Sequence, residues 1–297
     1  DYIAPLPVQS CRRCGFLMQN PRFSKEFYKR FYEEFYPISR VKSNSNKPND
    51  PKNIGGKNIV NEDGSPTESH FQSAYKRAKF LHEYIMNKNF NIPKKSFLDV
   101  GCGCGAFIKY FEEIGFESYG NDPEPLSVKG ALNRGIVIDN IPGEEMKFEK
   151  NKFGLIIIMG SLEHAHDPNI ILRKCWDYLV EGGLFVVQGR FFPVSESFRW
   201  LNANHHRFLT HETAQAILIK HGFTIISSTT DYVCGSGTGR IGNGFVFASK
   251  SSKNKKYLET KDLETLVDLI NEKKLIIKSE ELKEKLRKHD ATFTNVE

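Results

Sequence analysis

The stretch FLDVGCGCGAF, residues 97–107, joins a short apolar run, an acid and three glycines at alternate positions. AFIKYFEEIG follows with helical spacing. In this order, the three signals predict a buried strand that passes through a tight turn into a helix. Glycine is required because the turn needs backbone angles that a Cβ opposes, and because a ligand must approach the main chain closely. The free N–H groups at the start of the helix then face that ligand.

The acid before the turn separates two classes of cofactor. Gly101, Gly103 and Ala106 satisfy the G-x-G-x-x-G/A spacing of a dinucleotide-binding fold, so the spacing alone does not decide. Asp99, however, stands where a dehydrogenase usually carries apolar residues, and D-x-G-x-G-x-G resembles motif I of class I S-adenosylmethionine-dependent methyltransferases. In that family the acid and the loop hold the methionine part of the cofactor, whose ammonium suits a carboxylate that would repel a pyrophosphate. The resemblance implies cofactor contacts at Asp99, Gly101, Gly103 and Gly105.

A second acid ends the next predicted strand, FESYGND at residues 116–122. Asp122 lies about 17 residues beyond Gly105, where a carboxylate can accept both hydroxyls of a ribose. GNDP at residues 120–123 resembles the family's motif II, G-x-D/E-P, which implies that Asn121 and Asp122 also contact the cofactor.

FGLIIIMGSLEHAHDP, residues 153–168, is the second informative block. Phe153 to Met159 is predicted to be a buried strand, and Gly160 turns away from its carboxyl end, where ligands of open α/β sheets bind. The string matches the family's L-E-H-x-x-D-P closely, and we place Met159 and Gly160 beside the cofactor.

Three histidines are candidates for the chemistry. Methyl transfer from a sulfonium is an in-line displacement, and a hydroxyl acceptor must also lose a proton, a task that suits histidine near neutral pH. His164 follows the strand just described, and His205 or His206 lies in the loop after the next strand. The alternative is that these residues cap turns and orient loops. Ubiquinone-pathway O-methyltransferases resemble the chain at the same Glu-His, where E-x-x-E-H can hold magnesium. Gly160 occupies the first Glu position here, so we do not expect magnesium dependence.

Cys11 and Cys14 form half of a zinc knuckle, C-R-R-C, and no second close pair follows. The surrounding segment resembles the one that precedes bacterial methyltransferase domains of the methyltransferase-23 kind, in which a second CxxC lies upstream. The resemblance implies a structural zinc in the full-length protein, and two free thiols are the alternative. Aromatic residues at helical spacing in residues 24–36 predict an amphipathic helix.

Composition bounds the remaining possibilities. A hydrophobic share of 39% in 297 residues is enough for a sizeable core. No apolar run reaches membrane-spanning length and no signal peptide is visible, so we expect no membrane span. Six irregularly spaced cysteines indicate a reducing cytoplasm rather than a disulfide framework. The net charge of +6 is spread over Lys-Glu alternations, so nucleic acid is not an expected partner.

We expect an α/β fold with a Rossmann-like, doubly wound sheet of seven strands, the third of them at residues 136–138, after which Asp139 or Asn140 could meet the adenine. The chain divides into a CxxC and aromatic helical segment, a flexible insertion, a methyltransferase domain and a charged helical tail, at residues 1–38, 39–66, 67–250 and 251–297. Two amphipathic helices predicted in the tail could mediate self-association or contact a partner.

These features predict an O-methyltransferase that acts on a sugar, a glycan or another small molecule. One alternative is a nicotinamide-dependent oxidoreductase, which Asp99 and the lack of a Tyr-x-x-x-Lys constellation disfavour. Another is a cofactor-binding module without catalysis. Titration with each cofactor distinguishes the methyltransferase from the oxidoreductase. Formation of a methylated product distinguishes the methyltransferase from the module without catalysis.

Overall fold

The computed structural model describes residues 8–11, 17–20, 22–36, 61, 65–190, 205, 207–209, 211–229, 233, 243–251 and 293–296. Most of the predicted insertion, both predicted tail helices, Cys14 and His206 lie outside these ranges. Among the described helices, none combines the length and apolarity needed to cross a bilayer.

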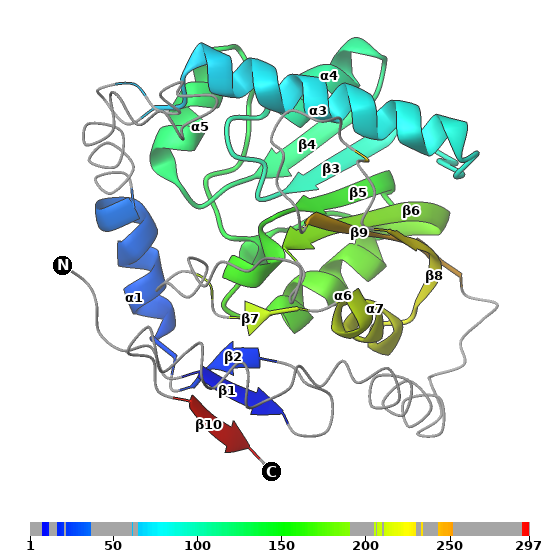
Figure 1. Cartoon of the computed structure of the whole chain (residues 1–297). Coiled ribbons are helices and arrows are strands. Elements are labelled where there is room, and N and C mark those ends of the chain that lie inside the picture. The colour runs from blue at the N-terminus through cyan, green and yellow to red at the C-terminus, as the bar shows by residue number, and fades with distance from the viewer. Residues whose placement is uncertain are drawn as a thin grey trace, which may run out of the picture.

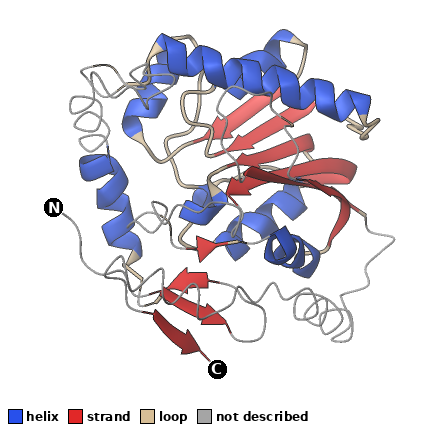
Figure 2. Cartoon of the chain, viewed as in Figure 1, coloured by secondary structure: helices blue, strands red, loops and turns tan. Residues whose placement is uncertain are grey.

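A six-stranded sheet forms the centre of the molecule (Figures 1 and 2). Its order is β4-β3-β5-β6-β9-β8; the first four strands are parallel, and β9 runs antiparallel to both β6 and β8. The strands are β3 (Ser96–Val100), β4 (Glu117–Asn121), β5 (Phe153–Met159), β6 (Leu179–Arg190), β8 (Phe223–Thr229) and β9 (Asn243–Lys250).

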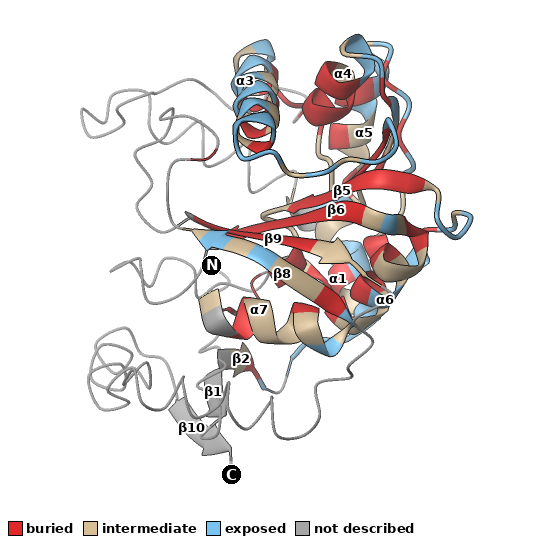
Figure 3. Ribbon diagram, turned by 90° about the vertical axis from the view of Figure 1, so that its right-hand side faces the viewer, coloured by how far each residue is buried: buried red, intermediate tan, exposed pale blue. Residues whose placement is uncertain are grey.

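Helices cover both faces of this sheet, as Figure 3 shows most clearly. On one face lie α3 (Glu68–Asn87), α4 (Ala106–Glu113) and α5 (Pro125–Leu132). On the other lie α6 (Pro168–Tyr178) and α7 (His211–Lys220). The predicted α/β, doubly wound architecture is therefore confirmed.

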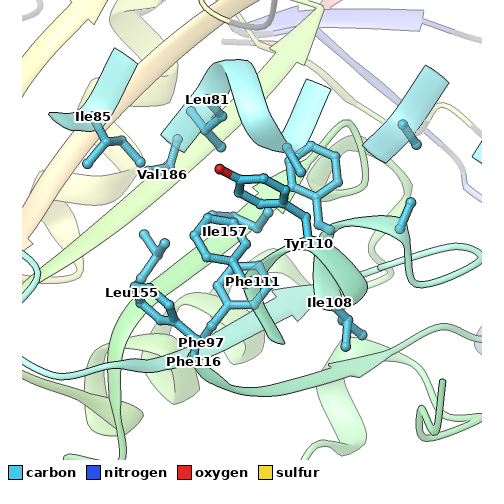
Figure 4. Close-up of a cluster of buried hydrophobic side chains, with 14 of the residues drawn as sticks. Leu81, Ile85, Phe97, Ile108, Tyr110, Phe111, Phe116, Leu155, Ile157 and Val186 are labelled. Carbon is cyan, nitrogen blue, oxygen red and sulfur yellow. The ribbon is translucent and has the colours of Figure 1, made fainter. Parts of the chain in front are cut away.

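Successive side chains along each strand point to opposite faces of the sheet and divide the core into two layers. In β5, Leu155 and Ile157 belong to the cluster under α3 and α4, whereas Ile156 and Ile158 belong to the cluster over α6 and α7. Both faces of β5 are buried, which explains its unbroken apolar run. Figure 4 shows the first cluster, in which Phe97 of β3 stacks on Phe111 of α4 with ring centroids 4.2 Å apart.

Helix α3 begins and packs as its sequence predicts. The Thr67 side chain accepts a hydrogen bond from the His70 N–H at 3.3 Å and caps the helix. Its buried face has the i, i+3/i+4 spacing of an amphipathic helix and consists of Phe71, Ala74, Ala78, Leu81 and Ile85.

The predicted count of seven strands is not confirmed in the described part of the chain, because the expected third strand is missing from the sheet. Residues 136–138 form no strand, and only one bridge, Asn121 to Asp139, extends the sheet beyond β4. Ile136 and Ile138 are buried in the core, and Val137 is 78% exposed. The segment lies at the edge of the sheet and pairs with β4 only at its end.

A second, small sheet has the order β10-β1-β2-β7, built from β1 (Val8–Cys11), β2 (Leu17–Gln19), β7 (Arg207–Phe208) and β10 (Phe293–Val296). It joins β1 and β10, which are remote in sequence, to β2 and β7 (Figure 1). The predicted helix of residues 24–36 is present as α1 (Lys25–Arg30) followed by a π-helical turn, η1 (Phe31–Phe35).

Candidate active site

The glycine turn lies at the carboxyl end of β3 and is tied to the end of β4. Gly101, Gly103 and Gly105 have φ angles of +76°, +54° and +76°, the left-handed region that only glycine adopts freely. The main-chain oxygen of Asn121 accepts hydrogen bonds from the N–H groups of Gly101 and Cys102, both at 2.9 Å. The turn is thus held at a defined place beside β4.

Gly103 borders an open space. A Cβ built there meets no atom within 4 Å, whereas one at Gly101 falls 2.6 Å from the Cβ of Ser161. The Gly103 N–H donates to Asp122 Oδ2 at 2.8 Å. A ligand can therefore approach the main chain at Gly103, next to the carboxylate of Asp122.

Asp99 lies in the middle of β3's buried run and is only 2% exposed. Burial, reinforced by the charge of Asp122 and opposed by Arg77, raises the pKa of Asp99 to about 8. Its Oδ1 accepts no hydrogen bond from any residue that the structure describes. Because an unpaired buried carboxylate is costly, a ligand cation at this oxygen would be strongly favoured.

Asp122 follows β4 on the other side of the turn. Besides the Gly103 contact, its Oδ1 accepts from the Glu124 N–H at 2.9 Å. A carboxylate offers about four acceptor positions, enough for ribose hydroxyls in addition to these two bonds. Asn121 is buried, and its amide donates to the Ile141 carbonyl at 3.0 Å, so its role in cofactor binding stays a prediction. The same holds for Asn140, whose amide donates to the main chain of Asp122.

Met159 ends β5, and Gly160 begins the turn that follows it. Gly160 has a φ of +69° and donates its N–H to the Gln188 carbonyl on β6 at 2.8 Å. The next residue, Ser161, donates its hydroxyl to the Val100 carbonyl at 2.7 Å. The turn after β5 is therefore joined directly to the start of the glycine turn.

Two of the three predicted histidines come together. His164 belongs to the 3₁₀ turn η3 (Leu162–His164), and His205 lies just before β7. Their ring centroids are 4.5 Å apart, at an angle of 36°. Glu163 joins them: one possible ligand atom from each of the three side chains lies within 4.8 Å of the others. Sequence reasoning assigned no role to Glu163, although the L-E-H string was its available signal.

The N-terminal segment packs against the loops that carry these histidines. Gln19 of β2 is buried and donates from Nε2 to the His205 carbonyl at 2.9 Å. Arg22 donates to the His166 carbonyl at 2.5 Å. Arg207 is half-buried, and desolvation together with the nearby charge of Arg22 lowers the pKa of its guanidinium to about 10; it donates to the same oxygen at 2.7 Å. The sequence contained no motif that predicted these contacts.

Tyr28 of α1 is the buried tyrosine of the segment, and burial raises its pKa to about 12. Its ring centroid lies 6.3 Å from that of His166. Tyr28 thus contacts the loop after η3.

Comparison with known proteins identifies the family. The model of a family described as a methyltransferase domain, methyltransferase-23, matches residues 71–228, more than half of the chain. The ubiquinone biosynthesis O-methyltransferase of Bordetella avium is 28% identical over 123 residues, 39% of this chain and 51% of that protein. The enzyme of the same name from Colwellia psychrerythraea is 31% identical over 121 residues, 36% of this chain and 49% of that protein. The chain spans about half the length of the curated relatives that it matches.

Among solved structures, the complex between the Haloferax volcanii Trm112 methyltransferase activator and a methyltransferase contains a similar chain. That chain matches the present one with a TM-score of 0.51 and 12% sequence identity, and the match covers 62% of this chain and 95% of that one. At this identity the likeness concerns the fold alone.

Proposed function

The chain belongs to the methyltransferase-23 family of class I S-adenosylmethionine-dependent methyltransferases, and from this premise we propose that it methylates a hydroxyl of a sugar, a glycan or another small molecule. The observation that carries the cofactor assignment is Asp99, a buried carboxylate with an unbonded oxygen in the strand that leads to the open space at Gly103.

The residues fit the cofactor's two polar parts. Asp99 would face the ammonium of the methionine part, while the main chain at Gly103 allows close approach. Asp122 would accept the ribose hydroxyls. When bound, the cofactor supplies a methyl group on a sulfonium, which is already activated for displacement. The protein's task is then to align the acceptor oxygen with that methyl and to handle the oxygen's proton.

The histidine pair supports a hydroxyl as the acceptor group. His164 lies in the turn after β5, which Ser161 joins to the glycine turn, and the ring of His205 lies beside that of His164. Imidazoles can hydrogen-bond a hydroxyl and take its proton near neutral pH. The matching relatives are named O-methyltransferases, which agrees with oxygen as the acceptor atom. His206 stays a candidate on its sequence position alone.

Replacing His164 by asparagine tests this assignment. If His164 handles the acceptor's proton, kcat should fall by about 10²–10⁴-fold, the usual contribution of a positioned acid–base group. The Kd for S-adenosylmethionine should hardly change, because the histidine faces the acceptor. Transfer from methyl-labelled cofactor to extracts of the source organism, and then to the purified acceptor, provides the assay.

His82→Asn is the matched control, since His82 lies on α3 and contacts Tyr110 at 2.9 Å. It should leave kcat unchanged. Unaltered turnover in His164→Asn would transfer the role to His205 or His206. A joint weakening of cofactor and acceptor affinity with a small loss in kcat would instead show that His164 only orients its loop.

Three further proposals concern the whole chain. We propose a cytoplasmic location, which is supported by Cys102, Cys104 and Cys175 being thiols rather than disulfides. We propose that Cys11, at the end of β1, and Cys14 contribute to a structural zinc site in the full-length protein. Self-association through residues 251–297 is the third proposal.

A further inference from the structure

Glu163, His164 and His205, here called the Glu-His-His trio, converge from two separate segments. Glu163 and His164 come from η3 at the end of β5, and His205 comes from the residue just before β7. One carboxylate oxygen and one ring nitrogen from each histidine all lie within 4.8 Å of one another. Convergence of this kind requires the tertiary fold, since neighbouring positions in η3 supply only two of the three side chains.

The carboxylate of Glu163 is the unusual member. Glu163 is 8% exposed, and among the residues that the structure describes it has no hydrogen bond or ion pair. A carboxylate with little access to water is favoured by a nearby cation. A cation placed between this carboxylate and the two imidazole rings would have all three side chains within reach.

Two imidazoles and one carboxylate favour a particular class of ion. Imidazole suits zinc and related transition metals, and His₂Glu is a known set of ligands for a zinc ion with an open position. Magnesium instead demands an octahedron made almost wholly of oxygen atoms. With zinc–ligand bonds of about 2.0–2.2 Å, the ligand atoms of one tetrahedral site lie roughly 3.3 Å apart. The distances between the three ligand atoms of the trio need to shorten by roughly 1.5 Å at most, and rotation of the side chains can provide this movement.

We propose that the Glu-His-His trio binds a divalent transition-metal ion of the zinc type, with a fourth position open to water or to the acceptor hydroxyl. This differs from an E-x-x-E-H magnesium site, because Gly160 stands at that pattern's first position and His205 comes from another loop. Binding of the ion depends only on the three side chains.

Participation of the ion in turnover rests on the proposed function. A hydroxyl bound to the ion has a lowered pKa and gives its proton to water. Its oxygen then forms a bond to the methyl carbon while the carbon–sulfur bond breaks, and the electron pair stays on sulfur. His164 would then act as a ligand rather than as a base, and both roles predict the same loss in the His164→Asn variant. A direct measurement of the ion is therefore needed.

The experiment uses the chain with Cys11→Ser and Cys14→Ser, so that the CxxC pair cannot contribute metal. The protein is treated with a chelator, dialysed, and titrated with Zn²⁺ by calorimetry and with Co²⁺ by visible absorption. We expect one ion per chain. Glu163→Gln and His205→Asn should each weaken binding at least about tenfold, since even changes to the groups that support a ligand cost about 10–100-fold. His82→Asn, the matched control on α3, should bind the ion as tightly as the parent.

X-ray absorption of the zinc-loaded parent keeps the test independent of how well the variants fold. The proposal requires nitrogen and oxygen neighbours that include two imidazoles. Sulfur neighbours, no bound ion, or unchanged affinity in Glu163→Gln would overturn it. Calorimetry with S-adenosylmethionine on the same samples separates the two levels of the account. If the parent binds S-adenosylmethionine but not zinc, the metal site alone is rejected. If the parent does not bind S-adenosylmethionine, the proposed function is rejected.

Discussion

Asp99 is a buried carboxyl whose Oδ1 has no hydrogen-bond partner among the residues that the structure describes. Its pKa of about 8 lies well above the ordinary aspartate value of 3.8. Between these two values the folded protein holds a proton that the unfolded chain releases, so stability falls as pH rises through this window. Below pH 3.8 both states are protonated, and the effect vanishes.

The first prediction follows from this sign. In the absence of ligand, Asp99→Asn should raise Tm relative to the parent at pH 8, by about 2–4 °C for each kcal/mol of relieved cost, and the gain should shrink toward pH 4. Thermal unfolding across this pH range measures it. A difference between variant and parent that does not depend on pH would contradict the assigned pKa.

The same residue predicts a proton release on binding. At pH 7 the free carboxyl is mostly protonated, and the cofactor's ammonium should lower its pKa and drive the proton into solution. Calorimetry in buffers of different ionisation enthalpy should detect this release in the parent and not in Asp99→Asn. Affinity should also rise with pH toward 8 in the parent. Equal heats in all buffers would indicate that Asp99 does not meet the ammonium.

Gly103 offers a second test at the residue scale, with Gly135 as its match. Both have positive φ angles, +54° and +72°, and in both a Cβ would meet no atom within 4 Å. Each change to alanine should therefore cost about 1–2 kcal/mol of stability through the left-handed backbone alone. Only Gly103→Ala should weaken S-adenosylmethionine, by tenfold or more, and Gly103→Val should abolish binding. Equal cofactor affinity in Gly103→Ala and Gly135→Ala would place the cofactor elsewhere.

At the scale of single elements, the sequence was most informative where local and tertiary requirements agree. The limits of β5 are those predicted, because both faces of its apolar run are covered. Residues 136–138 have similar local character, but they lie at the sheet edge with one neighbour, so the predicted strand contracts to a single bridge. The positive φ angles of the glycine turn were predictable, since only glycine tolerates them.

The contacts of β2 could not be predicted, because they join segments that are remote in sequence. The hydrogen bond from Gln19 to His205 depends on where His205 is placed by the fold. The same is true of the approach of Glu163 to His205. No local pattern encodes that placement. The candidate site could thus be predicted on its cofactor side, where one strand and one turn carry the residues, and only in part on its acceptor side.

A prediction for β2 concerns Gln19. Gln19→Leu removes the hydrogen bond to the buried His205 carbonyl, a loss of about 1–1.5 kcal/mol. We expect kcat/KM for the acceptor to fall about tenfold with the Kd for S-adenosylmethionine unchanged. Gln72→Leu, which removes an exposed glutamine that contacts Glu68, is the control. Full activity in Gln19→Leu would show that β2 does not position the acceptor side.

At the scale of the whole molecule, the two sheets divide the work. The strands β3, β4 and β5 of the six-stranded sheet carry the residues of the proposed cofactor site, and the small sheet places β2 and β7 beside His205. Residues from the N-terminal segment and from the family-matched domain therefore meet at one site. The N-terminal segment thus packs against the loops that carry His164 and His205.

The central claim is that the glycine turn of this chain binds S-adenosylmethionine and not a nicotinamide dinucleotide. Calorimetric titration of the ligand-free chain with S-adenosylmethionine and, separately, with NADH tests it most directly. We predict one S-adenosylmethionine per chain, lost in Gly103→Val, and no heat of binding with NADH, because a pyrophosphate offers the buried Asp99 carboxyl no cation with which to pair. Binding of NADH without binding of S-adenosylmethionine would contradict the account.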